Sequence, residues 1–212
     1  MPTPQTRPDQ IRLSTDLEKY LDWYAANDFA TLGNTQIADA KRVALFCSKK
    51  CPGSLIIQMH DLAHALRDAR ITVIGGFHSP VERECLNVLL KGRQPLIICP
   101  ARSLDSMRVP KEWRVPIEEG RLLLLSPFEQ KHRRATAELA QKRNEFVAAL
   151  AHLLFVAYAA PGSATESLCR KFLTCNKPVV TFDCSENAHL IEMGVMRFGS
   201  DSILQQLRSF GF

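Results

Sequence analysis

The sequence RVALFCSKKCPGSLIIQMHDLAHALRDARITVIGG, residues 42–76, decides the fold class. It opens with the unbroken apolar run 43–47, which predicts a buried strand. Apolar residues then recur at helical spacing over 55–67, and a second apolar run follows at 71–74. A strand, a helix and a strand with short connections predict a βαβ unit with two parallel strands.

The same alternation continues toward the carboxyl end of the chain. Pro80 stands in the first turn of the next predicted helix, where its missing N–H costs nothing. Residues 101–120 are polar and contain prolines, which predicts a loop. Further helices are predicted at 81–90, 136–151, 165–174, 187–193 and 203–210, and further strands at 95–99, 122–125, 153–157 and 178–182.

All of these predicted strands are continuous apolar runs, so both faces of the sheet are expected to be covered by helices. The predicted fold is α/β, with a doubly wound, mainly parallel, Rossmann-like sheet in three layers. Residues 1–36 are expected to form a tail, a helix over 15–29 and a linker through Gly33 and Asn34. Residues 37–212 form the predicted Rossmann domain.

Composition places the chain among ordinary globular proteins. Its 212 residues are 46% hydrophobic and 23% charged, which argues against disorder and fits one domain. No apolar run reaches the ~20 residues that cross a bilayer, and residues 1–9 hold no signal-peptide core. The seven cysteines, found mostly in apolar segments, indicate reduced thiols. We therefore expect a cytoplasmic protein with no membrane contact.

No cofactor or metal is expected. The short spacings Cys47 to Cys51 and Cys175 to Cys184 are not completed by a second ligand pair of the zinc type. The Gly75-Gly76 loop lacks the third glycine of a dinucleotide-binding fingerprint. A standard NAD site is therefore disfavoured.

The net charge is +5, and part of it is grouped in two places. One group is Lys49-Lys50, and the other runs from Lys131 to Arg134. Such groups either form a solvated basic face or flank an anionic ligand, because Lys and Arg supply most phosphate contacts to nucleic acids. Charge by itself leaves both interpretations open.

Three strand-to-helix loops could form a phosphate site at the carboxyl edge of the sheet, where open parallel sheets bind ligands. Each loop offers small residues, hydroxyls or backbone N–H groups at a helix start, although ordinary turns and helix caps would use the same residues. The third loop adds Glu166, which could accept ribose hydroxyls or protonate a leaving base. The candidates are Ser48, Lys49 and Gly53 in the first loop, Gly75, Gly76 and Ser79 in the second, and Gly162, Ser163, Thr165 and Glu166 in the third.

A further candidate is the pair Arg143-Asn144 on the helix before the 153–157 strand. The planar guanidinium of Arg143 suits phosphate, and the amide of Asn144 both donates and accepts hydrogen bonds. A surface helix can carry the same pair for solubility alone. The three loops and this pair together predict one anion pocket.

Residues 41–194 resemble the Rossmann-like domain of the DNA-processing DprA (Smf) family, within a superfamily that includes LOG and lysine decarboxylase-like proteins. The order and spacing of several short motifs carry the resemblance. They are RVALFCS at 42–48, VIGG at 73–76, GRLLLLSPF at 120–128, KRNE at 142–145, VAYAAPGS at 156–163 and KPVV at 177–180.

The resemblance implies a homodimer that binds single-stranded DNA or a nucleotide and is linked to DNA uptake or processing, with a recombinase as a possible partner. It also implies that a phosphate pocket is lined by Ser48, Lys49, Gly75, Gly76, Arg143 and Asn144.

Two alternatives remain open at this point. A LOG-type nucleoside 5'-monophosphate phosphoribohydrolase has a Pro-Gly-rich loop similar to residues 161–166, and here Glu166 and Arg143 would be its catalytic residues. Glycosyl cleavage needs such a carboxylate. A nucleotide sensor without catalysis is the second alternative, so the sequence does not decide whether the chain is an enzyme.

Overall fold

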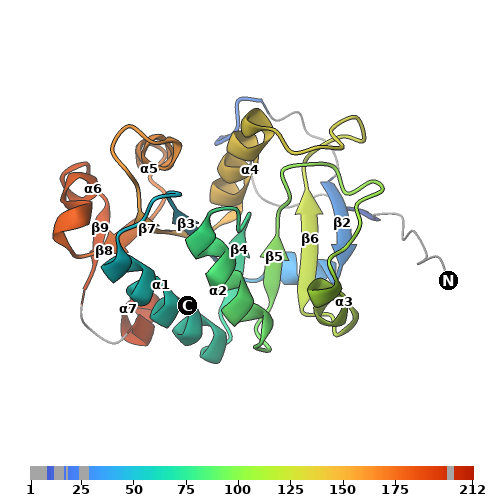
Figure 1. Ribbon diagram of the computed structural model, residues 1–212, viewed down its shortest axis with the longest axis horizontal. Helices are drawn as coiled ribbons and strands as arrows, with labels where there is room; N and C mark the ends of the chain where they lie inside the picture. The colour runs from blue at the N-terminus through green and yellow to red at the C-terminus, as the bar shows by residue number, and fades with distance from the viewer. Residues whose placement is uncertain (1–8, 12–16, 18, 24–28, 200–202) are drawn as a thin grey trace.

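The computed structural model describes residues 9–11, 17, 19–23, 29–199 and 203–212. Their strands form one nine-stranded sheet in the order β1-β2-β6-β5-β4-β3-β7-β8-β9 (Figure 1). All pairs from β6 to β9 along this order are parallel, whereas β1 and β2 are antiparallel to their neighbours. The predicted α/β class with a mainly parallel sheet is confirmed.

The strands and helices predicted from residue 43 onward are recovered with shifts of a few residues. The strands are β1 (Asp9–Ile11), β2 (Phe29–Gly33), β3 (Arg42–Cys47), β4 (Thr72–Gly75), β5 (Leu96–Ile98), β6 (Leu122–Ser126), β7 (Leu153–Tyr158), β8 (Val179–Phe182) and β9 (Met196–Phe198). The α-helices are α1 (Gly53–Asp68), α2 (Pro80–Leu90), α3 (Lys111–Glu118), α4 (Ala137–Leu150), α5 (Ala164–Thr174), α6 (Ala188–Glu192) and α7 (Ile203–Ser209).

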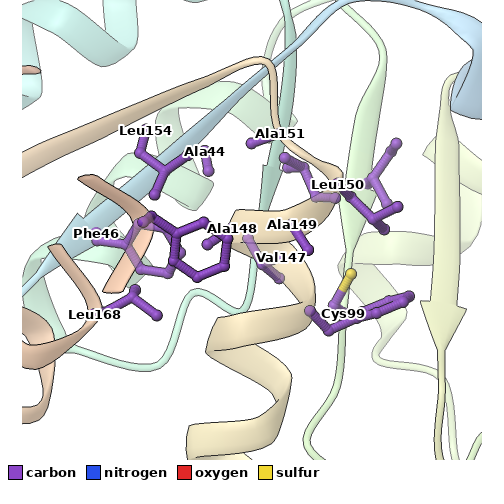
Figure 2. Packing of buried hydrophobic residues seen from close by; sticks show 14 of the residues in the cluster. Ala44, Phe46, Cys99, Val147, Ala148, Ala149, Leu150, Ala151, Leu154 and Leu168 are labelled. Carbon is purple, nitrogen blue, oxygen red and sulfur yellow. The ribbon is translucent and has the colours of Figure 1, made fainter. Parts of the chain in front are cut away.

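Two hydrophobic layers enclose the sheet, one on each face. Alternate residues of β3 divide between them, because successive side chains of a strand point to opposite faces. Ala44 and Phe46 pack with α4 and α5 on one face, and Figure 2 shows this packing around Ala148 and Leu168. Val43 and Leu45 pack with α1 and α2 on the other face. The predicted three-layer arrangement is confirmed.

Four strands and helices differ from the sequence prediction, and the first of them is β1, which lies in the predicted tail. Residues 29–33 form strand β2, which pairs with β6, where a helix end and a linker were expected. Residues 111–118 form helix α3 within the predicted loop, although Pro116 lies inside it. Strand β9 was not predicted.

The predicted helix over 15–29 lies largely outside the described residues, and those that are described, 17 and 19–23, form turns and not a helix. The division of the chain after residue 36 stays a prediction. In the described part of the chain, no helix has the length and apolar character that crossing a membrane requires.

The strand order reverses its direction of growth at β3. From β3 the chain adds β4, β5 and β6 on one side, and then returns to add β7, β8 and β9 on the other. At such a switch point the loops after two neighbouring strands separate and leave a crevice at their carboxyl ends. The loops after β3 and β7 border this crevice.

Candidate functional site

A cleft of about 750 Å³ opens at the carboxyl ends of β3 and β7. Its walls come from the β3–α1, β4–α2 and β7–α5 loops and from the first half of α4. This is the edge where ligands bind in open parallel sheets. The polar residues that line it are Ser48, Lys49, Lys50, His78, Ser79, Glu82, Thr136, Gln141, Arg143, Asn144, Ser163 and Thr165.

The structure brings most of the predicted site residues to this cleft. Ser48, Lys49, Ser79, Arg143, Asn144, Ser163 and Thr165 are among its lining residues. The predicted residues Gly53, Gly75, Gly76, Gly162 and Glu166 lie on the same loops or beside them but are not among the lining residues.

Ser48 joins the loops that follow β3 and β7. Its Oγ accepts a hydrogen bond from the backbone N–H of Ala160 at 3.0 Å and lies 3.3 Å from the Oγ of Ser163. Its backbone N–H donates to the carbonyl of Tyr158 at 2.9 Å. The hydroxyl of Ser48 therefore fixes the floor of the cleft as well as lining it.

The sequence analysis missed Glu82, whose buried carboxylate lies at the base of the cleft. One oxygen accepts the N–H of Cys47 at 3.0 Å, and the other accepts those of His78 at 2.8 Å and Ser79 at 3.3 Å. The Oγ of Ser79 accepts the N–H of Glu82 in return, which completes a capping box at the start of α2. A Ser-x-x-Glu spacing was the signal that could have identified it.

Arg143 is held in place on three sides and is only 3% exposed. Its Nη1 donates to the carbonyl of Cys99 at 3.1 Å, and its Nε donates to the Oδ1 of Asn144 at 2.8 Å. The backbone of Gly76 lies so close that a Cβ atom there would overlap the guanidinium. Burial lowers the pKa of Arg143, and the charge of Glu82 opposes that effect. Arg143 thus supports the cleft with a buried positive charge.

Side chains at the start of α5 already accept hydrogen bonds from the backbone N–H groups there. The Oγ of Ser163 accepts the N–H of Glu166 at 3.2 Å, and the carboxylate of Glu166 accepts the N–H of Gly162 at 2.8 Å. The N–H of Gly162, which was expected to bind an anionic ligand, is therefore already hydrogen-bonded to the carboxylate of Glu166. The same holds for the loop before α2, where Glu82 takes the N–H groups.

The accessible positive charge of the cleft comes from Lys49 and Lys50, whose side chains are exposed. Arg133 and Arg134, also exposed, immediately precede the lining segment 135–137. Within the described residues, no group of three or more His, Cys, Asp or Glu side chains could hold a metal ion. The lysines, the hydroxyls and the Asn144 amide that line the cleft are groups that could contact an anionic ligand.

Comparison with known proteins identifies a family for most of the chain. The model of the family described as DNA recombination-mediator protein A matches residues 27–196. No curated protein sequence matches the chain.

Among solved structures, the chain is similar to DNA processing protein A from Helicobacter pylori, described for a unique single-stranded DNA binding mode. The TM-score is 0.75 at 19% identity, with 95% of this chain and 94% of that chain covered. DNA processing protein A from Streptococcus pneumoniae gives a TM-score of 0.75 at 17% identity, covering 95% and 75% of the two chains. A molybdenum cofactor binding protein from Rippkaea orientalis gives 0.56 at 11% identity, covering 82% and 98%. At these identities the likeness concerns the fold.

Proposed function

The chain belongs to the DNA recombination-mediator protein A family, and from this premise we propose that its cleft binds single-stranded DNA. Membership of this family makes it a DNA-processing protein. The LOG-type hydrolase and the nucleotide sensor are not favoured, because the matching family is a recombination mediator.

One observation carries the proposal: an exposed lysine pair, Lys49-Lys50, lines a cleft that also presents hydroxyl and amide groups. Lysines supply the salt-dependent contacts to phosphate, while Ser and Asn side chains position the backbone. Glu82 and Glu166 already fill the loop N–H positions, so phosphates are expected to contact the lysines and hydroxyls instead of the helix starts. This assigns Ser48, Lys49, Ser163 and Thr165 to the contact surface and Arg143 to its support.

A titration followed by fluorescence anisotropy tests the proposal. A labelled single-stranded oligonucleotide is expected to bind more tightly than the matching duplex. The affinity should fall with salt, with a log–log slope of roughly 0.7 for each phosphate that is contacted. Absent binding, or binding that salt does not weaken, would contradict the proposal.

The remaining expectations from the family are proposals of the same kind. We infer that the chain forms a homodimer in the cytoplasm and passes its strand to a recombinase. Light scattering on the purified chain tests the dimer, because a monomer across the micromolar range would contradict it. A pull-down with a recombinase loaded on single-stranded DNA tests the partner.

A further inference from the structure

Two histidines lie one turn apart on helix α1. His60 is exposed and His64 is half-buried, and their ring centroids are 4.6 Å apart with an angle of 58° between the ring planes. Residues four apart are neighbours on one face of a helix, and two imidazoles at this spacing can hold a metal ion between them. We propose that His60 and His64 form a chelating site for a divalent cation of the Ni²⁺ and Cu²⁺ class.

The separation of the two rings fits one class of metal geometry. A metal ion about 2.1 Å from an imidazole nitrogen lies roughly 3.2 Å from the ring centroid. Two rings bound at a right angle then have centroids about 4.5 Å apart, and two rings bound at the tetrahedral angle about 5.2 Å apart. The observed 4.6 Å matches the right angle. Ni²⁺ and Cu²⁺ take ligands at right angles, whereas Zn²⁺ is mostly tetrahedral.

The nitrogens of both rings are available to a metal ion. Within the described part of the chain, no hydrogen bond involves the imidazole of His60 or of His64. Two other histidines use their rings to hold the backbone, since His152 accepts an N–H at 3.2 Å and His189 lies 2.8 Å from a carbonyl oxygen. Rotation about the Cβ–Cγ bond turns the nitrogens of a ring and leaves its centroid almost in place. The pair can therefore bind a metal ion without a change in the backbone.

The helix fixes the positions from which the two rings start. His60 and His64 lie in the middle of α1, which spans Gly53–Asp68. Met59 and Ala63, the residues just before them, are fully buried against the sheet. A site on a packed helix keeps its geometry better than a site on a loop. Little order is lost when a cation binds here.

The charges around the pair also favour a cation. Asp61 is exposed and lies three residues before His64, which makes it a neighbour on the helix surface. Arg67, the nearest following cation on α1, is paired with Asp68 at 2.8 Å. Its charge is therefore largely offset. In the part of the chain that the structure describes, no third side chain completes a larger metal-binding group, so Asp61 acts only through its charge.

Binding is a simple exchange of ligands. Each neutral imidazole donates a lone pair and replaces one water molecule of the hydrated cation, and water keeps the other positions. No bond in the protein breaks, and no electron is transferred. Once one imidazole is bound, the second binds intramolecularly, so the pair should hold the cation far more tightly than one histidine.

The site is independent of the proposed function. Neither His60 nor His64 is among the residues that line the cleft. Removing either ring is therefore expected to leave the binding of single-stranded DNA unchanged.

Calorimetric titration of the full, untagged chain with Ni²⁺ tests the site. Ni²⁺ is the probe because, unlike Cu²⁺, it does not oxidise the free thiols of the chain. One ion per chain is expected, with tighter binding of Ni²⁺ than of Mn²⁺, as the usual order of divalent metals requires. One ion for every two chains would overturn a site that a single helix completes.

Three variants locate the binding. His60→Ala and His64→Ala should each weaken the affinity for Ni²⁺ by roughly 100-fold, because each leaves a single imidazole. The control His132→Ala removes a histidine elsewhere and should bind as the wild type does. Equal affinities in the wild type and in His60→Ala would overturn the proposal.

A register variant separates the spacing from the number of histidines. The double variant His64→Ala/Ala65→His keeps two histidines on α1 but turns the second away from the face of His60. Ni²⁺ should raise the urea midpoint of the wild type, because it binds the folded helix, and should leave that of the register variant unchanged. An equal rise in both would contradict the site. These measurements decide the metal site whether or not the cleft binds DNA.

Discussion

The guanidinium of Arg143 fills the space that a side chain at Gly76 would occupy. It donates there to the carbonyl of Cys99, which follows strand β5. One side chain from α4 thus locks the ends of two neighbouring strands under the cleft. The absence of a side chain at Gly76 is a requirement for this contact.

Gly76→Ala is therefore expected to displace the guanidinium and lower the free energy of unfolding by about 2 kcal/mol, the worth of a charged hydrogen bond. Urea denaturation measures the change. Gly53→Ala is the matched control, because no atom lies within 4 Å of a Cβ placed there. If the two variants are equally stable, Arg143 is not held by this contact.

Glu82→Gln should destabilise the protein although the shape of the side chain is kept. The carboxylate accepts the N–H groups of Cys47, His78 and Ser79, and an amide NH₂ cannot accept any of them. Leaving one buried N–H unpaired costs about 1–3 kcal/mol. Chemical denaturation compares this variant with Glu84→Gln, an exposed change on the same helix that should shift stability by less than about 0.5 kcal/mol. Equal effects would argue against a structural role for the carboxylate.

The double variant Lys49→Ala/Lys50→Ala should weaken binding to single-stranded DNA. If each lysine contacts one phosphate, the log–log salt slope falls by about 1.4. Anisotropy titrations at several salt concentrations give both the affinity and its salt slope. Lys91→Ala/Arg93→Ala removes the same charge from exposed positions just before β5, at the opposite edge of the sheet. Equal losses in both double variants would mean that net charge, and not the cleft, determines the affinity.

The stability of the protein should fall at alkaline pH because of its buried thiols. Burial raises the pKa of Cys169 to about 12 from 9.0. Between these values the unfolded chain has lost the proton that the folded chain keeps, so the free energy of unfolding decreases as pH rises, by about 1.4 kcal/mol per pH unit for one thiol. Cys169→Ala should remove this part of the slope in urea denaturation above pH 9. At pH 7 the variant should differ from the wild type only by a constant packing cost, and an unchanged alkaline slope would contradict the prediction.

Strand β2 should be part of the stable core. The ring centroids of Phe29 and of Phe146 on α4 are 5.1 Å apart, and both side chains are buried. Phe29→Ala is expected to lower the free energy of unfolding by roughly 3 kcal/mol, as large-to-small changes in a core do. A single, less stable unfolding transition supports this. A loss under about 1 kcal/mol would instead favour a separate N-terminal unit that ends at residue 36.

The layered α/β fold could be predicted from the sequence because strands and helices show local patterns of apolar residues. Apolar runs such as 122–125 and the helical spacing in 55–67 depend only on near neighbours. Strand β2 shows no such pattern, because FATLG is short and its pairing partner β6 lies far along the chain. Helix α3 was hidden by Pro116, which usually marks a loop.

The sequence by itself also determined which loops reach the carboxyl edge, and with them Ser48, Lys49 and Ser163. Only the tertiary structure decided how their polar groups are used. The partner of the Cys47 N–H is Glu82, and the carbonyl that holds Arg143 belongs to Cys99. These partners are distant in sequence, and a hydrogen bond needs atoms within about 3 Å, a condition that packing alone fulfils. Spacing along the chain therefore located the cleft, and folding decided that carboxylates fill its N–H groups and leave the lysines accessible.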